Sequence, residues 1–409
     1  MRQCTLGENV TDAYMPIGER IGMYRRRRGL SQLRLGGLIN RSEDWVSKVE
    51  RGEIPIDRLS VLISVAGALQ VTLADLLRDH RHPRDNGQGE HHLVVATRQT
   101  LIRLPTLAGG APRPLEVLAA DLDAVNDLRQ GANYTQALAA MPKLLTDLQT
   151  AAAALCDDHR TMHLLGQAYG LAAILMSRFA RHDLAWIAAD RAVTLGERTG
   201  RPDDQAHAAF RLSHVLLGAG RLDEAIQVAE AGLTRSRPHL RAPRVRCLAG
   251  AMHLPMAIAA ARKGDRGGAF EALDEATART VDPASKRVVI PRDLAATTQY
   301  GPANVQIHQV SVAVDLGDAG DALRIAERIP LGEVSDNRRS RHLIDVALAH
   351  NYRRDTEGMV AALLESERLA REQIVHFPLV REMVYDAVRR ERGHANEQLH
   401  ALVDRLEAA

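Results

Sequence analysis

The apolar residues of the first eighty positions recur with the period of an α-helix. Ile17, Ile21 and Tyr24 are spaced i, i+4, i+7, on one face of a helix that a run of arginines and Gly29 brings to an end. Asn40 can adopt the left-handed conformation of a tight turn. Further apolar stripes each begin after a residue that favours a helix start: Ser31, Ser42, Pro55 and Thr72. The pattern predicts five short helices, the second and third joined by a tight turn.

From Leu115 onward, helical stripes alternate with short turns, and one turn motif recurs. It is rich in Gly, Arg and Asp and is followed by an alanine near the start of the next helix, as in residues 220–225, 264–269 and 317–322. Alignment on that alanine gives six anchor positions: Ala137, Ala185, Ala225, Ala269, Ala322 and Met359. The anchors are 48, 40, 44, 53 and 37 residues apart, so the repeat is irregular in length.

Residues at fixed offsets from the anchors test this repeat. Twelve residues before the anchors stand Val125, Ala173, Ser213, Ala257, Val310 and Ala347. Seven residues after them stand Leu144, Ala192, Gly232, Ala276, Ile329 and Ser366. In four of the six units both sites hold Ala, Ser or Gly, so two antiparallel helices can approach closely there. A generic alanine-rich helical bundle is the alternative that this pattern leaves open.

The predicted fold class is all-α, and the composition agrees with it. Aromatic residues make up only 3% of the 409 residues, which disfavours a β-sandwich or barrel, and apolar residues make up 45%, enough for a large core. We predict a five-helix module over residues 16–79, a linker over 80–114 with a possible connecting helix, and a superhelical array of helix pairs over 115–409. Pro, Asn and Gly residues between positions 80 and 89 indicate the linker.

Charge is unevenly distributed along the chain. The whole chain has 53 basic and 51 acidic residues, a formal charge of +2, whereas residues 16–58 hold ten basic and six acidic residues. This stretch carries a net charge of +4 and leaves −2 for the rest of the chain. A polybasic protein is therefore excluded, and a surface for nucleic-acid phosphates is expected only near the N-terminus.

Other features predict a cytoplasmic protein without a cofactor, metal or membrane partner. Cys4, Cys156 and Cys247 are far apart in sequence, which argues against a disulfide framework or a cysteine-rich zinc site. No run of about 18 apolar residues predicts a membrane span, and residues 1–15 lack the apolar core of a signal peptide. A solvated linker explains best the four histidines that fit no standard zinc spacing: His80, His82, His91 and His92. No enzyme is expected, because the common catalytic motifs are missing from the sequence.

Two pieces of the N-terminal module resemble the phage-repressor-like (XRE) family of helix-turn-helix domains. They are Gly29-Leu-Ser-Gln32, which opens the second helix, and Val46-Ser-Lys-Val-Glu-Arg-Gly52, which closes the third. The resemblance covers residues 17–77. It implies that the helix over residues 42–51 enters the major groove of double-stranded DNA. A helical bundle that binds no DNA is the alternative.

The resemblance implies two groups of DNA-contacting residues. Candidates for reading base edges are Ser42, Glu43, Asp44, Ser47 and Lys48. Candidates for contacting phosphates are Arg28, Gln32, Arg41 and Arg51. Arg51 has the alternative of pairing with a carboxylate inside the module.

The chain departs from the family pattern in and after the turn. Asn40 stands where Gly is usual, Arg41 stands where an apolar residue is usual, and the acidic pair Glu43 and Asp44 opens the third helix. Acidic side chains repel phosphates, although a glutamate can accept a hydrogen bond from the cytosine amino group. The alternative role of both acids is to complement the dipole of the helix N-terminus.

The helix pairs of residues 115–409 resemble the tetratricopeptide repeat, whose stacked units form a superhelix with a concave face. In families with this repeat, polar residues of the inner helix bind a ligand, which implies a ligand groove here. The positions eighteen residues before the anchors, together with His214, supply the candidates Gln167, His207, His214, Asn304 and Arg341. Each has the alternative of a solvated polar residue.

A Tyr-Gly-Pro turn at Tyr300 interrupts the repeat. It leads into a helix on which Asn304 and His308 share one face at i, i+4. The segment resembles a signature of repeat-bearing regulators of actinobacteria, which implies that His308 also lines a sensor pocket. A purely structural turn is the alternative.

A DNA-binding module joined to a helical-repeat domain resembles the architecture of the peptide-sensing regulators of Gram-positive bacteria. It implies a homodimeric transcription regulator. A peptide or small-molecule effector bound by the repeats would change the spacing of the two heads on a DNA operator. The alternative is a protein-interaction scaffold whose helix-turn-helix is vestigial or serves for docking.

Overall fold

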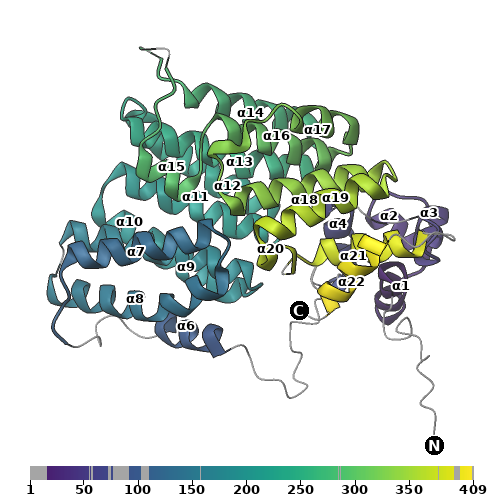
Figure 1. The fold of residues 1–409 in the computed structure, drawn as a ribbon, viewed down its shortest axis with the longest axis horizontal. Coiled ribbons are helices and arrows are strands. Elements are labelled where there is room, and N and C mark those ends of the chain that lie inside the picture. Colours follow the sequence, from purple (N-terminus) through teal and green to yellow (C-terminus); the bar gives the residue numbers. More distant parts are fainter. Residues whose placement is uncertain are drawn as a thin grey trace, which may run out of the picture.

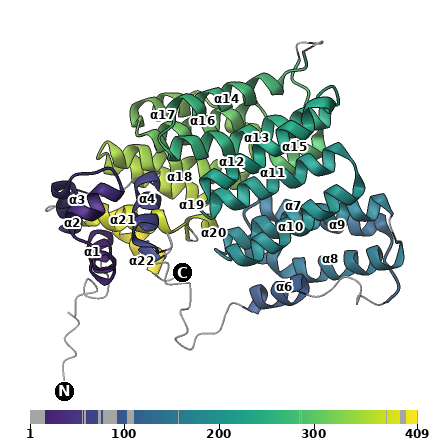
Figure 2. The same cartoon turned by 180° about the vertical axis from the view of Figure 1, so that it is seen from behind.

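The computed structural model describes residues 16–54, 56, 59–71, 75–76, 92–102, 110–156, 158–283, 285, 287–375, 377–390 and 397–407. The regular structure of these residues is helical, apart from one isolated antiparallel bridge between Val281 and Val288. The predicted all-α fold is therefore confirmed. Figure 1 shows a small N-terminal head at one end of a larger helical array, and Figure 2 shows the same arrangement from behind. None of the described helices is long and apolar enough to cross a membrane.

The head contains α1 (Ile17–Arg27), α2 (Gln32–Leu38), α3 (Glu43–Glu50) and α4 (Leu59–Leu69). Both predicted serine caps are present. Ser31 Oγ accepts a hydrogen bond from the Arg34 backbone N–H, and Ser42 Oγ accepts one from that of Trp45, each at 3.1 Å. The residue between these two helices, Asn40, has a φ of +54°, the left-handed conformation predicted for the turn. The start of the expected fifth helix at Thr72 lies outside the described residues.

The helices of the head approach closely because two glycines have no side chain. A Cβ atom on Gly18 of α1 would lie 2.0 Å from the carbonyl oxygen of Val49 in α3, and one on Gly36 of α2 would lie 2.6 Å from the carbonyl oxygen of Arg41. Neither backbone oxygen can move away without displacing a helix or the turn. These contacts fix the position of α3 in the head.

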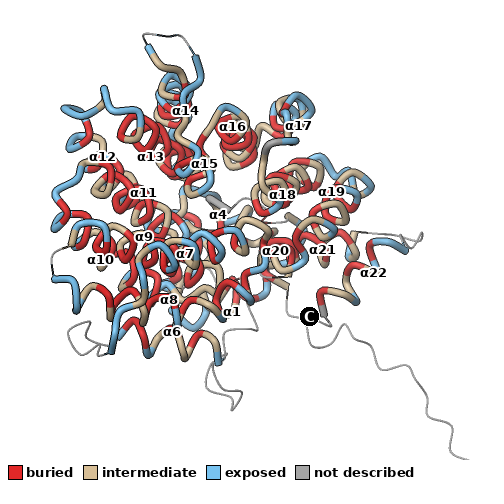
Figure 3. The backbone as a smooth tube through the Cα atoms, turned by 60° about the vertical axis from the view of Figure 1, so that its left-hand side comes forward, coloured by how far each residue is buried: buried red, intermediate tan, exposed pale blue. Residues whose placement is uncertain are grey.

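Within the described residues, the array contains six successive helix pairs. They are α7 (Leu115–Gln130) with α8 (Tyr134–Ala154), α9 (His159–Arg178) with α10 (His182–Thr199), α11 (Pro202–Gly218) with α12 (Leu222–Ser236), α13 (Pro243–Arg262) with α14 (Arg266–Thr280), α16 (Pro302–Leu316) with α17 (Ala319–Ala326), and α18 (Asp336–Tyr352) with α19 (Thr356–Leu369). Each predicted anchor is the fourth residue of a second helix and is fully buried. The residues twelve before and seven after the anchors are also buried. Figure 3 shows α13 buried along its length, whereas α12 exposes one side.

Two further helices lie outside the six pairs. One accounts for the longest spacing between anchors, and the other lies in the segment expected to be a linker. The short α15 (Arg292–Thr298) lies between α14 and α16, where the anchors are 53 residues apart. Helix α6 (His92–Ile102) lies in the segment 80–114, expected as a linker with a possible connecting helix. It packs against α8 and buries Val94 and Leu101. Two short 3₁₀ turns, η3 (Arg237–His239) and η4 (Leu331–Glu333), complete the connections.

The array closes on itself, because its first pair contacts its last. The hydroxyl of Tyr134 in α8 donates to Asn337 Oδ1 in α18 at 2.6 Å. The Thr135 backbone N–H donates to Glu372 Oε2 in α20 (Arg371–Val375) at 2.9 Å. We call these contacts the ring seam.

The head packs against the C-terminal helices of the array. Arg20 in α1 forms a buried ion pair with Glu382 in α21 (Pro378–Arg390), and α22 (Glu397–Glu407) follows. Val65 of α4 belongs to the same hydrophobic cluster as Val384 of α21. Figures 1 and 2 agree in placing α21 and α22 beside the head. The head and the array therefore share one core.

Candidate functional site

The N-terminal end of α3 is exposed, whereas its other side is buried in the head. Ser42, Glu43 and Asp44 are exposed, and Val46 and Val49 of the same helix are buried. This division leaves the beginning of the helix accessible for contact with another molecule. Three of the five base-reading candidates lie in this exposed turn.

The other base-reading candidates take part in polar contacts within the head. Lys48 Nζ pairs with Asp44 Oδ2 at 2.7 Å, one turn apart on α3. Arg51 contacts the hydroxyl of Ser47 and pairs with Glu53 Oε1 at 2.6 Å. The hydrogen bond from Arg51 lowers the pKa of Glu53. For Arg51 the geometry thus favours the alternative of an internal ion pair over phosphate contact.

Gln32 links α2 to α3. Its Nε2 atom donates to Glu50 Oε2 at 2.8 Å, and the same carboxylate accepts two hydrogen bonds from Arg25 at 2.5 and 2.8 Å. Burial of Glu50 opposes its charge, but the hydrogen bonds from Arg25 and Gln32 outweigh burial and lower its pKa. Gln32 therefore positions the two helices, and its predicted contact with phosphate remains a prediction.

Exposed cations surround the turn and the end of α1. Arg41 is exposed, and its guanidinium lies 5.6 Å from the centre of the Trp45 ring. Arg28 is also exposed and donates to the Ala68 carbonyl. Arg26, Arg27 and Arg34 add three more exposed guanidinium groups. A cationic surface next to an exposed helix N-terminus is suited to contact phosphates on either side of a DNA groove.

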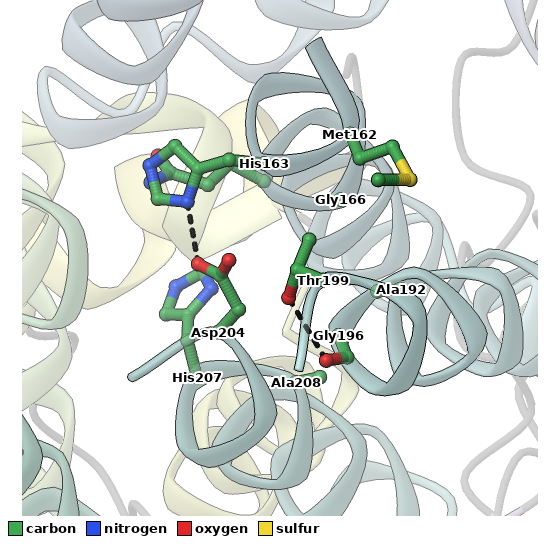
Figure 4. Close-up of a pocket in the computed structure, with 10 residues that line it drawn as sticks. Met162, His163, Gly166, Ala192, Gly196, Thr199, Asp204, His207 and Ala208 are labelled. Carbon is green, nitrogen blue, oxygen red and sulfur yellow. Dashed lines mark hydrogen bonds and ion pairs between the residues drawn. The ribbon is translucent and has the colours of Figure 1, made fainter. Parts of the chain in front are cut away.

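Gln167 lines a small pocket between α9, α10 and α11, apart from most other candidates for ligand binding. Figure 4 shows this pocket with His163, Asp204 and His207. The Nε2 atom of Gln167 is 2.7 Å from Nε2 of His163, whose Nδ1 atom is 2.5 Å from Asp204 Oδ1. His207 lines the same pocket. The pocket volume of about 10 Å³ has room for about one water molecule in this structure, and ligand binding by Gln167 and His207 remains a prediction.

Asn304 and His308 meet the first helix of the sixth pair. Arg338 of α18 donates from Nε to Asn304 Oδ1 at 2.5 Å and lies 2.7 Å from His308 Nε2. His308 Nδ1 is 2.8 Å from the Asn304 carbonyl oxygen. Burial, with the charge of Arg338 beside it, holds the pKa of His308 well below its usual value, so this imidazole is neutral at pH 7.

The remaining candidates lie on α11 and α18. His207 accepts a hydrogen bond from Arg211 Nε at 3.3 Å, and His214 packs edge-to-face on Phe210. Arg341 donates to Asp345 Oδ1 at 3.1 Å and lies 4.2 Å above the ring of Phe377. Burial lowers the pKa of His214 to about 3, with contributions from the charges of Arg211, Arg338 and Arg178. These candidates therefore lie among a group of arginines, of which Arg341 is one.

We call this group the inner arginine cluster, and its members share a position on the first helix of a pair. They are Arg129 of α7, Arg178 of α9, Arg211 of α11, and Arg338 and Arg341 of α18. Only Arg341 was predicted from the sequence. The sequence does contain one feature that could have indicated the other four residues: arginine recurs on the first helices of four pairs. That recurrence does not reveal that the arginines lie close together, because only the ring seam brings α7 next to α18.

The described residues contain no group of three or more His, Cys, Asp or Glu side chains that could hold a metal ion. His80, His82 and His91 lie outside the described residues, and His92 begins α6. The prediction that these histidines form no metal site therefore remains untested.

Comparison with known proteins identifies the head. Residues 16–80 match the family model of a helix-turn-helix domain, which confirms the resemblance drawn from residues 17–77. No curated protein matches the chain. The matching solved structures include Bacillus thuringiensis PlcR in complex with the peptide PapR7 and DNA. That match has 12% sequence identity and a TM-score of 0.29, and it covers 93% of this chain and 100% of that chain. The similarity is weak, so the assignment depends on residues 16–80, and we conclude that the chain carries an N-terminal helix-turn-helix domain on an array of six helix pairs.

Proposed function

We propose that this protein is a sequence-specific DNA-binding transcription regulator of the cytoplasm. The observation that carries the proposal is the exposed N-terminal turn of α3, held by the Ser42 cap and the left-handed Asn40, beside the exposed cations Arg28 and Arg41. In helix-turn-helix domains the second helix of the motif lies in the major groove, where side chains of its first turn reach base edges. Glu43 is then the residue that distinguishes cytosine at its position.

The array senses an effector and controls the DNA affinity of the head. The support for this step is the common core of head and array, in which the Arg20–Glu382 ion pair joins α1 to α21, so that a movement of α21 would displace the head. In a homodimer, a shift of the two arrays changes the separation of the two α3 helices. DNA affinity depends on that separation, because half-sites repeat about every 34–36 Å along the duplex. An effector that binds one arrangement better than the other therefore changes DNA affinity.

Selection from a random duplex library with the full-length chain tests DNA binding directly. We expect one enriched sequence with two related half-sites, and binding that weakens steeply with salt. Glu43→Gln is expected to change the preferred base at one position of each half-site. The control Arg235→Ala removes an exposed arginine of α12 and leaves binding unchanged.

Two outcomes would contradict the proposal. Absence of duplex binding at low salt would favour the alternative of a protein-interaction scaffold with a docking head. Light scattering could also show that the protein is a monomer, both when free and when bound to the selected duplex. That result would exclude the dimer mechanism and leave DNA recognition intact.

A further inference from the structure

Most guanidinium groups of the inner arginine cluster donate to neutral acceptors. Arg129 donates to Asn126 Oδ1 from Nε and Nη2, at 3.1 and 2.8 Å. Arg211 donates to the backbone carbonyl of Thr297 at 2.8 Å. Both guanidinium groups are buried, yet their acceptors are neutral. Buried cations in proteins are normally paired with a carboxylate or another anion.

The members contributed by α9 and α18 follow the same pattern. Arg338 donates to the neutral Asn304 amide and contacts the neutral His308, and Arg178 lies 5.5 Å from the centre of the Tyr134 ring. Within the part of the chain that the structure describes, Arg341 is the one member of the cluster bound to a carboxylate, that of Asp345. Asp345 is thus the carboxylate in direct contact with the cluster, and Asp127 and Asp315 act on Arg129 and Arg341 at longer range.

The cations are close enough to weaken one another's charged forms. Burial lowers the pKa of Arg211 to about 9, and Arg129 adds to the effect. Burial also lowers the pKa of Arg338 to about 10; the charge of Asp345 opposes this effect, and the charges of Arg341, Arg178 and Arg129 add to it. This mutual influence indicates that the five side chains share one electrostatic environment, although they come from four helices.

The five arginines of the cluster differ in their exposure to solvent. Arg129 and Arg211 are buried, whereas Arg178, Arg338 and Arg341 are only half-buried. A ligand approaching from solvent would meet the half-buried members first. The ring seam lies beside the cluster, because Tyr134 packs on Arg178 and bonds Asn337, the sequence neighbour of Arg338. With two of the five guanidinium groups buried, the cluster suits a compact ligand better than an extended chain.

We propose that the inner arginine cluster binds a small, multiply charged anion with phosphoryl or carboxylate groups. Arginine binds both groups through two parallel N–H donors, and several guanidiniums together favour a ligand with more than one negative charge. The bound anion would connect α7, α9, α11 and α18, and so link the first pair of the array to the last. This inference specifies the effector class of the proposed function, and its regulatory meaning depends on that function.

Calorimetry and thermal unfolding of the full-length chain, without DNA, test the site. The probes are inorganic pyrophosphate and citrate, each compared with sodium chloride at equal ionic strength. We expect at least one probe to bind and to raise the Tm beyond the effect of sodium chloride. Binding of pyrophosphate alone would identify phosphoryl chemistry, and binding of citrate alone would identify carboxylate chemistry.

Two variants assign the binding to the cluster. Arg338→Gln and Arg178→Gln each remove one half-buried cation, and we expect either to weaken probe binding by roughly 10- to 100-fold. Their Tm values without probe should stay equal or rise, because repulsion between like charges is relieved. A merely structural role would instead lower these Tm values. Arg235→Gln, an exposed change on α12, should bind the probes like the wild type.

Three results would overturn the proposal: no response beyond that to sodium chloride, an equal response in wild type and Arg338→Gln, or tighter binding of an acidic seven-residue peptide than of either small anion. Because no DNA is present, these results are independent of the selection experiment. Anion binding without DNA binding would leave the site intact and refute the regulator.

Discussion

Arg20 of α1 and Glu382 of α21 are 362 positions apart in the sequence and form an ion pair that is almost completely buried. The pair joins the DNA-binding head to the last part of the array. A charge in this position is costly unless its partner is present, because water cannot solvate it. The pair therefore favours one arrangement of the head over others.

Removing one partner should destabilise this arrangement. We expect Glu382→Leu to lower the free energy of unfolding by about 3–5 kcal/mol, because Arg20 stays buried and loses the charge of Glu382. Urea unfolding measures the loss, and limited proteolysis reports release of the head. The double variant Arg20→Met with Glu382→Leu should recover most of the loss. Glu365→Gln, at an exposed pair with Arg368, is the control and should change little. Equal stability of Glu382→Leu and Glu365→Gln would contradict the role of the pair.

Close packing of α1 on α3 gives a second prediction. Gly18→Ala places a Cβ atom 2.0 Å from the Val49 carbonyl oxygen, so we expect it to destabilise the head by at least about 2 kcal/mol and to abolish DNA binding. Gly37→Ala in α2 is the matched control, because nothing lies within 4 Å of its added methyl group. That variant should be neutral or stabilising by up to about 1 kcal/mol. Circular dichroism during thermal unfolding distinguishes the two.

Arg41 should contribute to DNA affinity without specifying sequence. We expect Arg41→Ala to weaken binding to all duplexes alike and to reduce the slope of log affinity against log salt by about 1. Fluorescence anisotropy at several salt concentrations measures that slope. A change in preferred sequence, with the slope unaltered, would instead place Arg41 at a base edge.

Acidification should destabilise the array through His214, whose pKa is lowered by burial. The pKa of His214 is lowered to about 3 in the folded chain, so the unfolded chain binds more protons between that value and about 6.5. Stability is therefore full above pH about 6.5 and falls as the pH drops, by up to about 1.4 kcal/mol per pH unit for this residue. Tm measurements from pH 7.5 to 5.5 should show a smaller loss for His214→Gln than for the wild type. His239→Gln, at an exposed site, should retain the wild-type slope.

The ring seam should be detectable by its local effect. Tyr134→Phe removes the hydroxyl that contacts Asn337 and Gln373, and we expect a loss of about 1–3 kcal/mol. Hydrogen exchange should become faster in α8, α18 and α20. Tyr169→Phe removes a hydroxyl bound to Gln149, between neighbouring pairs, and should leave exchange in α18 and α20 unchanged. Faster exchange there in both variants would argue against a specific seam.

Local chemistry explains which parts of the molecule could be predicted from sequence. The caps at Ser31 and Ser42, the turn at Asn40 and the six anchors depend on neighbouring residues or on a repeated spacing, and all were predicted. The contacts of Gly18 with Val49 and of Arg20 with Glu382 depend on how helices meet in space. No periodicity in one helix encodes its partner, so these contacts were missed.

The candidate sites show the same limit. Asn304, His308 and Arg341 were selected by their place on inner helices, and they do lie around one cluster. Arg129 and Arg178 were missed because they join that cluster only through the packing of α7 against α18, which the sequence does not reveal. Gln167 shares the offset of Asn304 but lies in another pocket, because the ligand candidates of a curved array do not all point to one place.

The seam at Tyr134 also limits how the protein can change over evolutionary time. An open solenoid gains or loses units at little cost, since each unit touches only its neighbours. Here a duplicated or deleted helix pair would separate Tyr134 from Asn337 and misalign both ends. Closure therefore penalises any change in the number of pairs, as it penalises a change of strand number in a closed barrel, whereas substitutions and changes of loop length leave the seam in place.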